Sequence, residues 1–156
     1  MAFTNSNDYI TGRLPVPYPA GGEVLYVRFP LAMATADLAL NSIGQIGILP
    51  AGCIPIQVEV VGTDMDSGAG AGVYQVGILD AAGTAISTAA ADGGGAWGDT
   101  GTAVATAFDK QLTRTLNNMS TVTATNADRK IAVKVTTAPS TAVAGTLGLQ
   151  LWYRSI

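Results

Sequence analysis

The sequence predicts an all-β fold, an antiparallel β-sandwich with jelly-roll or related Greek-key topology and an extended N-terminal arm. Short segments of alternating apolar and polar residues recur along the chain, and Gly, Ala, Thr and Asp separate them. Little of the sequence has the 3.6-residue period of a helix. With 156 residues, the chain has the length of one domain with its own core. We therefore expect an arm over residues 1–22 and a sandwich domain over residues 23–156.

The arm is predicted from its prolines. Pro15, Pro17 and Pro19 disfavour helix and bias the chain toward extended structure. The arm also has apolar side chains that can anchor it on its own domain or on a neighbouring subunit, whereas the alternative is a frayed terminus. These side chains are candidate interface residues: Tyr9, Ile10, Leu14, Val16 and Tyr18.

Seven or eight strands are predicted after the arm. The clearest alternation lies in residues 54–60, where Ile54, Ile56, Val58 and Val60 share one face, which we expect to be core. Residues 111–120 are compatible with a short helix or with an irregular crossing. The predicted strands cover residues 23–29, 38–49, 54–60, 73–79, 84–88, 102–108, 130–135 and 147–154, and the segment 38–49 is the less regular one because it is rich in Gly.

A long loop is predicted over residues 89–102, which are mostly Gly, Ala and Asp. Trp97 stands alone in it as the expected anchor of the loop and as a further candidate interface residue. The turn at Asp64–Gly68 is superficially similar to the opening of a calcium loop, but its Gly falls one position early for that motif. A turn between strands explains the same residues, and we expect no metal and no cofactor.

Catalysis is not expected from this composition. The chain has no His and one Cys, so a Ser-His or Cys-His nucleophile with its own His base is excluded. Cys53 lies among apolar neighbours and is predicted to be a small buried core residue. No segment has the length of a membrane span or the pattern of an export signal, so no membrane partner is expected.

Charge is distributed unevenly along the chain. Residues 1–109 carry ten acidic and two basic residues, a net charge of −8, whereas residues 110–156 carry one acidic and six basic residues, a net charge of +5. Folding can place these charges on two different faces, or it can mix them if strands from both parts alternate in the sheets. The acidic total of −3 opposes binding to nucleic acid. The basic residues expected to contact adjacent subunits are Arg114, Arg129, Lys130 and Lys134.

Three segments resemble small structural proteins of tailed bacteriophages: IGILPAGCIPIQVEVV at residues 46–61, TDMDSG at 63–68 and VYQVGILD at 73–80. The chain is similar to a head decoration, or cement, protein. This resemblance implies a homo-oligomer, a trimer rather than a dimer, which is made in the host cytoplasm and then joins the virion. It also implies that the protein binds the outer capsid surface and bridges major capsid protein subunits. It assigns no role to individual residues.

The main alternative is a receptor- or carbohydrate-binding domain of a phage tail fibre or spike. In that case Trp97, Trp152 and residues 89–102 would form the recognition surface, with aromatic rings stacked on sugars. The scarcity of aromatic residues, 6% of the chain, argues against this alternative.

Overall fold

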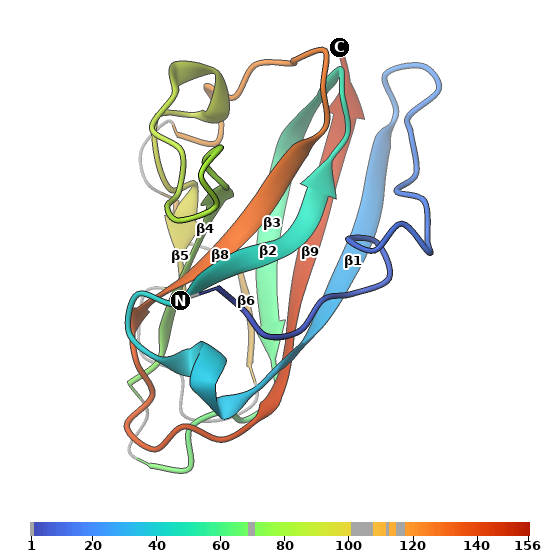
Figure 1. The fold of residues 1–156 in the computed structure, drawn as a ribbon. Helices are drawn as coiled ribbons and strands as arrows, with labels where there is room; N and C mark the ends of the chain where they lie inside the picture. The colour runs from blue at the N-terminus through green and yellow to red at the C-terminus, as the bar shows by residue number, and fades with distance from the viewer. Residues whose placement is uncertain (1, 69–70, 101–107, 112, 115–117) are drawn as a thin grey trace.

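The computed structural model describes residues 2–68, 71–100, 108–111, 113–114 and 118–156, and it confirms the all-β sandwich. Two antiparallel sheets face each other, one with the strand order β1-β9-β3-β6 and the other with the order β2-β8-β4-β5-β7 (Figure 1). The strands within the described residues are β1 (Val24–Met33), β2 (Ile43–Leu49), β3 (Cys53–Gly62), β4 (Val73–Ile78), β5 (Gly98–Asp99), β6 (Phe108–Gln111), β7 (Thr113–Arg114), β8 (Arg129–Thr137) and β9 (Gly145–Ser155).

The strand order is that of a jelly roll. The first strand, β1, pairs with the last, β9, and the second, β2, pairs with the second to last, β8. Further inside the roll, β3 pairs with β6 and β4 pairs with β5. Two short 3-10 helices, Thr35–Leu38 and Ala90–Asp92, lie in the connections. In the described part of the chain, no helix has the length and apolar character needed to span a membrane.

The two halves of the sequence are interleaved in both sheets. The basic C-terminal part supplies β8 and β9, and each of these strands lies between two strands of the acidic part. Strand β8 is flanked by β2 and β4, and β9 is flanked by β1 and β3. The charges therefore mix on folding, and the sequence asymmetry does not produce separate acidic and basic faces.

The core lies between the two sheets and follows the predicted alternation. In β1 the buried side chains are at every second position from Val27 to Met33, and in β8 they include Ile131, Val133 and Val135. Tyr74 and Tyr153 are also fully buried. Burying a large apolar side chain stabilises a fold by about 1.5 to 3 kcal/mol, so these two-residue repeats define which face of each strand is inside.

A β-bulge corrects the face predicted for residues 54–60. The register of β3 against β9 shifts between Pro55 and Gln57, and the inward face changes at that point. Val58 and Val60 are in the core as predicted, but Ile54 is only partly buried and Ile56 is 38% exposed. The extra residue in the bulge thus turns the first half of the predicted apolar face outward.

Three further segments predicted from the sequence, at residues 84–88, 102–108 and 111–120, can be compared with the structure. Residues 84–88 are not a strand but contribute one isolated bridge, between Ile86 and Leu79. The strand predicted at 102–108 lies outside the described residues except for Phe108, which begins β6. Within 111–120, the structure describes the end of β6, the two residues of β7 and a turn at 118–120.

Asp66 ties two loops together at one end of the sandwich. Its carboxylate is 97% buried by accessible area, being 3% exposed, and it accepts hydrogen bonds from four backbone N–H groups and one hydroxyl. Burial alone would raise the pKa of Asp66, but the N–H groups of Thr141, Ser140, Ala71 and Gly68 outweigh it and hold the pKa well below 3.8. The aspartate is thus a staple between the β3–β4 and β8–β9 loops.

Replacing this staple should make the fold less stable in a pH-dependent way. We expect Asp66→Asn to lower the melting temperature by roughly 5 °C at neutral pH, because a neutral amide is a weaker acceptor for these donors. The folded pKa lies below the ordinary value of 3.8, so the contribution is complete above that pH and is lost as pH falls below it. The difference between the two proteins should therefore shrink in acid.

Calorimetry of both proteins across this pH range tests the prediction. Asp8→Asn is a matched control, because the Asp8 side chain is 55% exposed and only pairs with Arg13 at the surface. Equal melting temperatures for wild type and Asp66→Asn at neutral pH would contradict the stapling role.

Candidate interaction surfaces

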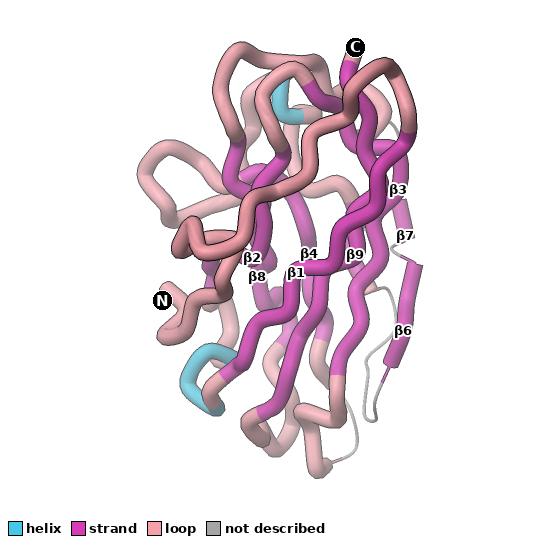
Figure 2. The backbone as a smooth tube through the Cα atoms, turned by 90° about the vertical axis from the view of Figure 1, so that its right-hand side faces the viewer, coloured by secondary structure: helices cyan, strands magenta, loops and turns pink. Residues whose placement is uncertain are grey.

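The N-terminal arm lies along the side of the sandwich where each sheet ends in an edge strand. These edges are β1 in one sheet and β2 in the other. From Ala2, which forms a bridge with Ile43 of β2, the arm crosses toward the start of β1 (Figures 1 and 2). Edge strands expose unpaired backbone groups. The arm thus covers the two edge strands, whose backbone N–H and C=O groups lack hydrogen-bond partners within the sheets.

Three polar side chains fix the first half of the arm. Asp37 is fully buried and accepts hydrogen bonds from the backbone N–H and the hydroxyl of Thr4, at 2.8 and 2.7 Å. Asn5 donates to the carbonyl of Ala32 in β1. Asn7 donates to the carbonyl of Ile46 in β2 at 2.8 Å, in a buried hydrogen bond. The arm therefore satisfies carbonyl groups on the edge strands of both sheets.

Aromatic rings of the arm pack on the same edges. Phe3 lies against Gly44 of β2 so closely that a Cβ on Gly44 would meet the ring at 2.4 Å. Tyr9 packs edge-on against Phe29 of β1, with ring centroids 4.9 Å apart. A glycine at position 44 is therefore required for Phe3 to pack on β2.

The second half of the arm is held by Tyr153 of β9. The Tyr153 hydroxyl donates a hydrogen bond to the carbonyl of Pro17. Burial, assisted by Cys53 and Tyr9, raises the pKa of Tyr153 to about 12, so the hydroxyl keeps its proton near neutral pH. Val16 also packs against the core, whereas Leu14 and Tyr18 are 47% and 59% exposed.

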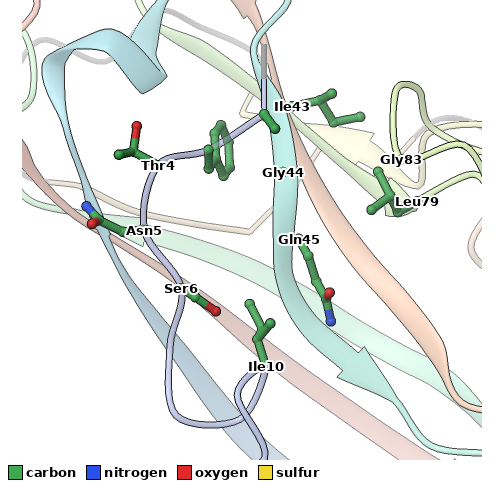
Figure 3. Close-up of a pocket in the computed structure, with 11 residues that line it drawn as sticks. Thr4, Asn5, Ser6, Ile10, Ile43, Gly44, Gln45, Leu79 and Gly83 are labelled. Carbon is green, nitrogen blue, oxygen red and sulfur yellow. The ribbon is translucent and has the colours of Figure 1, made fainter.

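Two grooves flank the arm. One, of about 290 Å³, runs between residues 2–6 and β2, and Ile10 and Leu79 also line it (Figure 3). The other, of about 340 Å³, is lined by Tyr9, Leu14, Val16 and Tyr18 together with Ile48, Pro50 and Asp128. The five predicted arm residues therefore divide between two grooves on the same side of the molecule.

The predicted basic residues do not form one cluster. Lys130 and Lys134 alternate with buried residues of β8 and lie on the outer face of its sheet. Arg129 is 91% buried, being 9% exposed, and its guanidinium donates to the carbonyls of Ala91 and Cys53 and pairs with Asp92 at 3.3 Å. The Arg129 guanidinium therefore lies inside the domain, where it links β8 to β3 and to the 3-10 helix at 90–92, and it is not part of the outer surface. Arg114 pairs with Gly98 through β7, and its side chain is outside the described structure.

Trp97 is a core residue and offers no contact surface. Its side chain is 1% exposed, and its indole N–H donates to the carbonyl of Asp92. It anchors the loop between β4 and β5, while Ile86 of the same loop lies over Gly77 of β4. This loop therefore covers part of the outer face of the sheet that contains β4. The burial of Trp97 removes it from the recognition surface of the carbohydrate-binding alternative.

The outer face of the other sheet carries an aromatic pair, in which Trp152, predicted for the recognition surface of the carbohydrate-binding alternative, lies beside Tyr26, which was not predicted. Tyr26 of β1 and Trp152 of β9 are register partners with ring centroids 4.9 Å apart. Tyr26 is 48% exposed, and Val24 and Ile56 beside them are 53% and 38% exposed. The alternation of Tyr26 with the partly buried Leu25 and the core residue Val27 was the available signal. We call Val24, Tyr26, Ile56 and Trp152 the aromatic face.

The described residues contain no grouping of three or more His, Cys, Asp or Glu side chains that could hold a metal ion. Cys53 is fully buried, and burial together with nearby Asp128 raises the pKa of its thiol despite the opposing effect of Arg129. The described surface carries the two grooves, the aromatic face and the outward lysines of β8, on a small jelly-roll domain.

Two solved structures with a similar fold are of phage capsids. A chain in the structure described as "Capsid of Ralstonia phage GP4" matches with a TM-score of 0.75 and 22% identity, over 96% of this chain and 96% of that chain. A chain in the structure described as "Cyanophage Pam1 capsid asymmetric unit" matches with a TM-score of 0.55 and 19% identity, over 92% and 94% of the two chains. No family model and no curated protein matches the sequence. These likenesses show a shared fold over nearly the whole chain.

The Tyr153 hydrogen bond predicts how firmly the arm is held. We expect Tyr153→Phe to weaken docking of residues 14–18 by about 1 kcal/mol, because the Pro17 carbonyl loses its donor. Trypsin should then cut after Arg13, the one Lys or Arg that precedes Arg28, about fivefold faster. Tyr26→Phe is the matched control, since it removes a hydroxyl that contacts Gln150 and not the arm. Unchanged cleavage in Tyr153→Phe would contradict this anchor.

Proposed function

We propose that this protein is a capsid decoration, or cement, protein that binds the outer surface of a phage head and stabilises contacts between major capsid subunits. The observation that carries the proposal is the match over 96% of both chains to a chain from a phage capsid structure. A single small jelly roll suits a unit that attaches to a shell.

The surface of the domain supports the same function. The arm fills the open side between β1 and β2 and satisfies carbonyl groups on both strands, so the domain folds as a closed unit. The aromatic face and the two lysines then remain for contacts with other proteins. Aromatic residues are enriched in protein interfaces, and complementary charges guide docking. The proposed partners are the major capsid protein and other copies of this chain, as a trimer, on the virion surface.

The stoichiometry of purified virions tests the proposed function directly. Quantitative mass spectrometry should find this chain in a copy number near that of the major capsid protein. A few copies per particle would place it at the tail or at a vertex instead, and absence from the particle would contradict a virion role.

The outward lysines of β8 should contribute to attachment. We expect Lys130→Glu combined with Lys134→Glu to weaken binding to undecorated capsids about tenfold at low ionic strength, and the loss should shrink in high salt. Arg154→Glu reverses an exposed charge beside the aromatic face on the other sheet, so a loss confined to the lysine variant would assign the electrostatic contact to the outer face of β8. Binding that is unchanged at low and high salt would remove the electrostatic part of the proposal.

The aromatic face favours one second candidate, a carbohydrate-binding domain. Tyr26 and Trp152 lie beside Gln57, Glu59 and Gln150, side chains that can bond sugar hydroxyls. A glycan array probed with the wild type and with Trp152→Ala distinguishes the two functions. Glycan binding that depends on Trp152, together with low copy number in virions, would favour recognition over attachment.

A further inference from the structure

The arm is held by a slot that lies entirely on the body of the domain. The slot consists of Phe29 and Ala32 of β1, Asp37, Gly44 and Ile46 around β2, and Tyr153 of β9. The contacts described above for residues 3–17 of the arm, polar and aromatic, are made to these positions. The slot is therefore complementary to residues 3–17 of the arm.

The residues that connect the arm to β1 are exposed and make few contacts with the rest of the domain. We call residues 20–22 the hinge. All three are exposed, Gly22 has a φ of 75°, and a Cβ built on Gly21 or Gly22 would meet no atom within 4 Å. The backbone N–H of Ala20 donates a hydrogen bond to the Glu23 side chain, and the N–H of Gly22 donates one to the Ser155 hydroxyl. Glycine tolerates many backbone conformations, so the hinge can redirect the arm without disturbing the core.

An empty slot is unfavourable. Without the arm, the buried carboxylate of Asp37 loses both bonds from Thr4 and keeps the one from the N–H of Ala34. The Ala32 and Ile46 carbonyls lose their donors as well. Water would have to replace these bonds, and the apolar surface covered by Phe3 and Tyr9, including Phe29, would become exposed, which is unfavourable. The slot should consequently be filled in every assembled state, either by the arm of the same chain or by an identical arm from another copy.

We propose that the arms are exchanged in the assembled protein, so that residues 2–19 of each copy occupy the slot of a neighbouring copy. Exchange keeps every contact of the slot and changes only the hinge, which is why swapping an identical element is a low-cost route to oligomers. The arm also leaves 47% of Leu14 and 59% of Tyr18 exposed, and both residues line the groove of about 340 Å³. The body of the neighbouring copy can cover these apolar surfaces when an arm crosses between the two.

This proposal rests on the homo-oligomer of the proposed function, and cysteine crosslinking of the purified protein tests it without the capsid. In a Cys53→Ser background, one chain carries Phe3→Cys and a second chain of different mass carries Phe3→Ala together with Gly44→Cys, because an intact Phe3 ring would clash with Cys at position 44 and expel that chain's own arm. The Phe3 Cβ lies 2.7 Å from a Cβ built on Gly44, so the two thiols meet only when an arm is in a slot. The chains are unfolded together, refolded, oxidised and separated on a non-reducing gel.

Exchanged arms should give a disulfide-linked heterodimer at a level at least about tenfold above a control mixture. The control pairs Phe3→Cys with Val143→Cys, an exposed residue of the β8–β9 loop that is 41% exposed and outside the slot. A heterodimer level equal to this control would overturn the proposal. So would a Phe3→Cys/Gly44→Cys double variant that crosslinks only within single chains at every protein concentration.

A second pair protects the test against a folding defect at Phe3. Asn5→Cys and Ala32→Cys join the arm to β1, where the Asn5 side chain lies 2.9 Å from the Ala32 carbonyl. This pair must give the same result for the proposal to stand. Crosslinks confined to single chains, with a near-equal copy number in virions, would overturn arm exchange and leave the attachment function intact.

Discussion

The fold depends on how its open side is closed. A sandwich of two sheets has four edges, and β1 and β2 end their sheets on the same side of this molecule. Their outward backbone groups would otherwise be unpaired and would invite pairing with other chains. The arm solves this with side-chain amides from Asn5 and Asn7 and with two aromatic rings, rather than with a regular added strand. This packing depends on Gly44, because any larger side chain at that position would clash with the Phe3 ring.

Local alternation explains why much of the sandwich could be predicted from the sequence. The repeats in β1, β8 and β9 fix which residues face the core, because neighbouring side chains of a strand point to opposite faces. The prediction was wrong for Ile54 and Ile56, since a bulge adds a residue without a clear mark in the local pattern. The jelly-roll pairing of first with last strands is a property of the whole chain and was predicted only as one of two topologies.

The surface was harder to predict than the core. Arg129 and Trp97 belong to residue types that often mark contact sites, yet both are buried because partners distant in sequence hold them. Arg129 reaches the Cys53 carbonyl, 76 positions away, and Asp66 accepts from Ser140, 74 positions away. No local sequence pattern predicts hydrogen bonds between residues so far apart in the chain. Conversely, Tyr26 and Trp152 become one surface feature only through the register of β1 and β9.

The order of the strands along the chain has a consequence for biosynthesis. Strands β8 and β9 come last among the strands described, yet each occupies an interior position in its sheet. During translation, β1 and β3 therefore lack the strand that separates them, and so do β2 and β4. The β2-β8-β4-β5-β7 sheet cannot be completed until β8 has left the ribosome, and the β1-β9-β3-β6 sheet cannot be completed until β9 has. Such distant pairings make folding slow. The nascent chain must keep its apolar strands from associating with other chains for nearly the whole time of its synthesis.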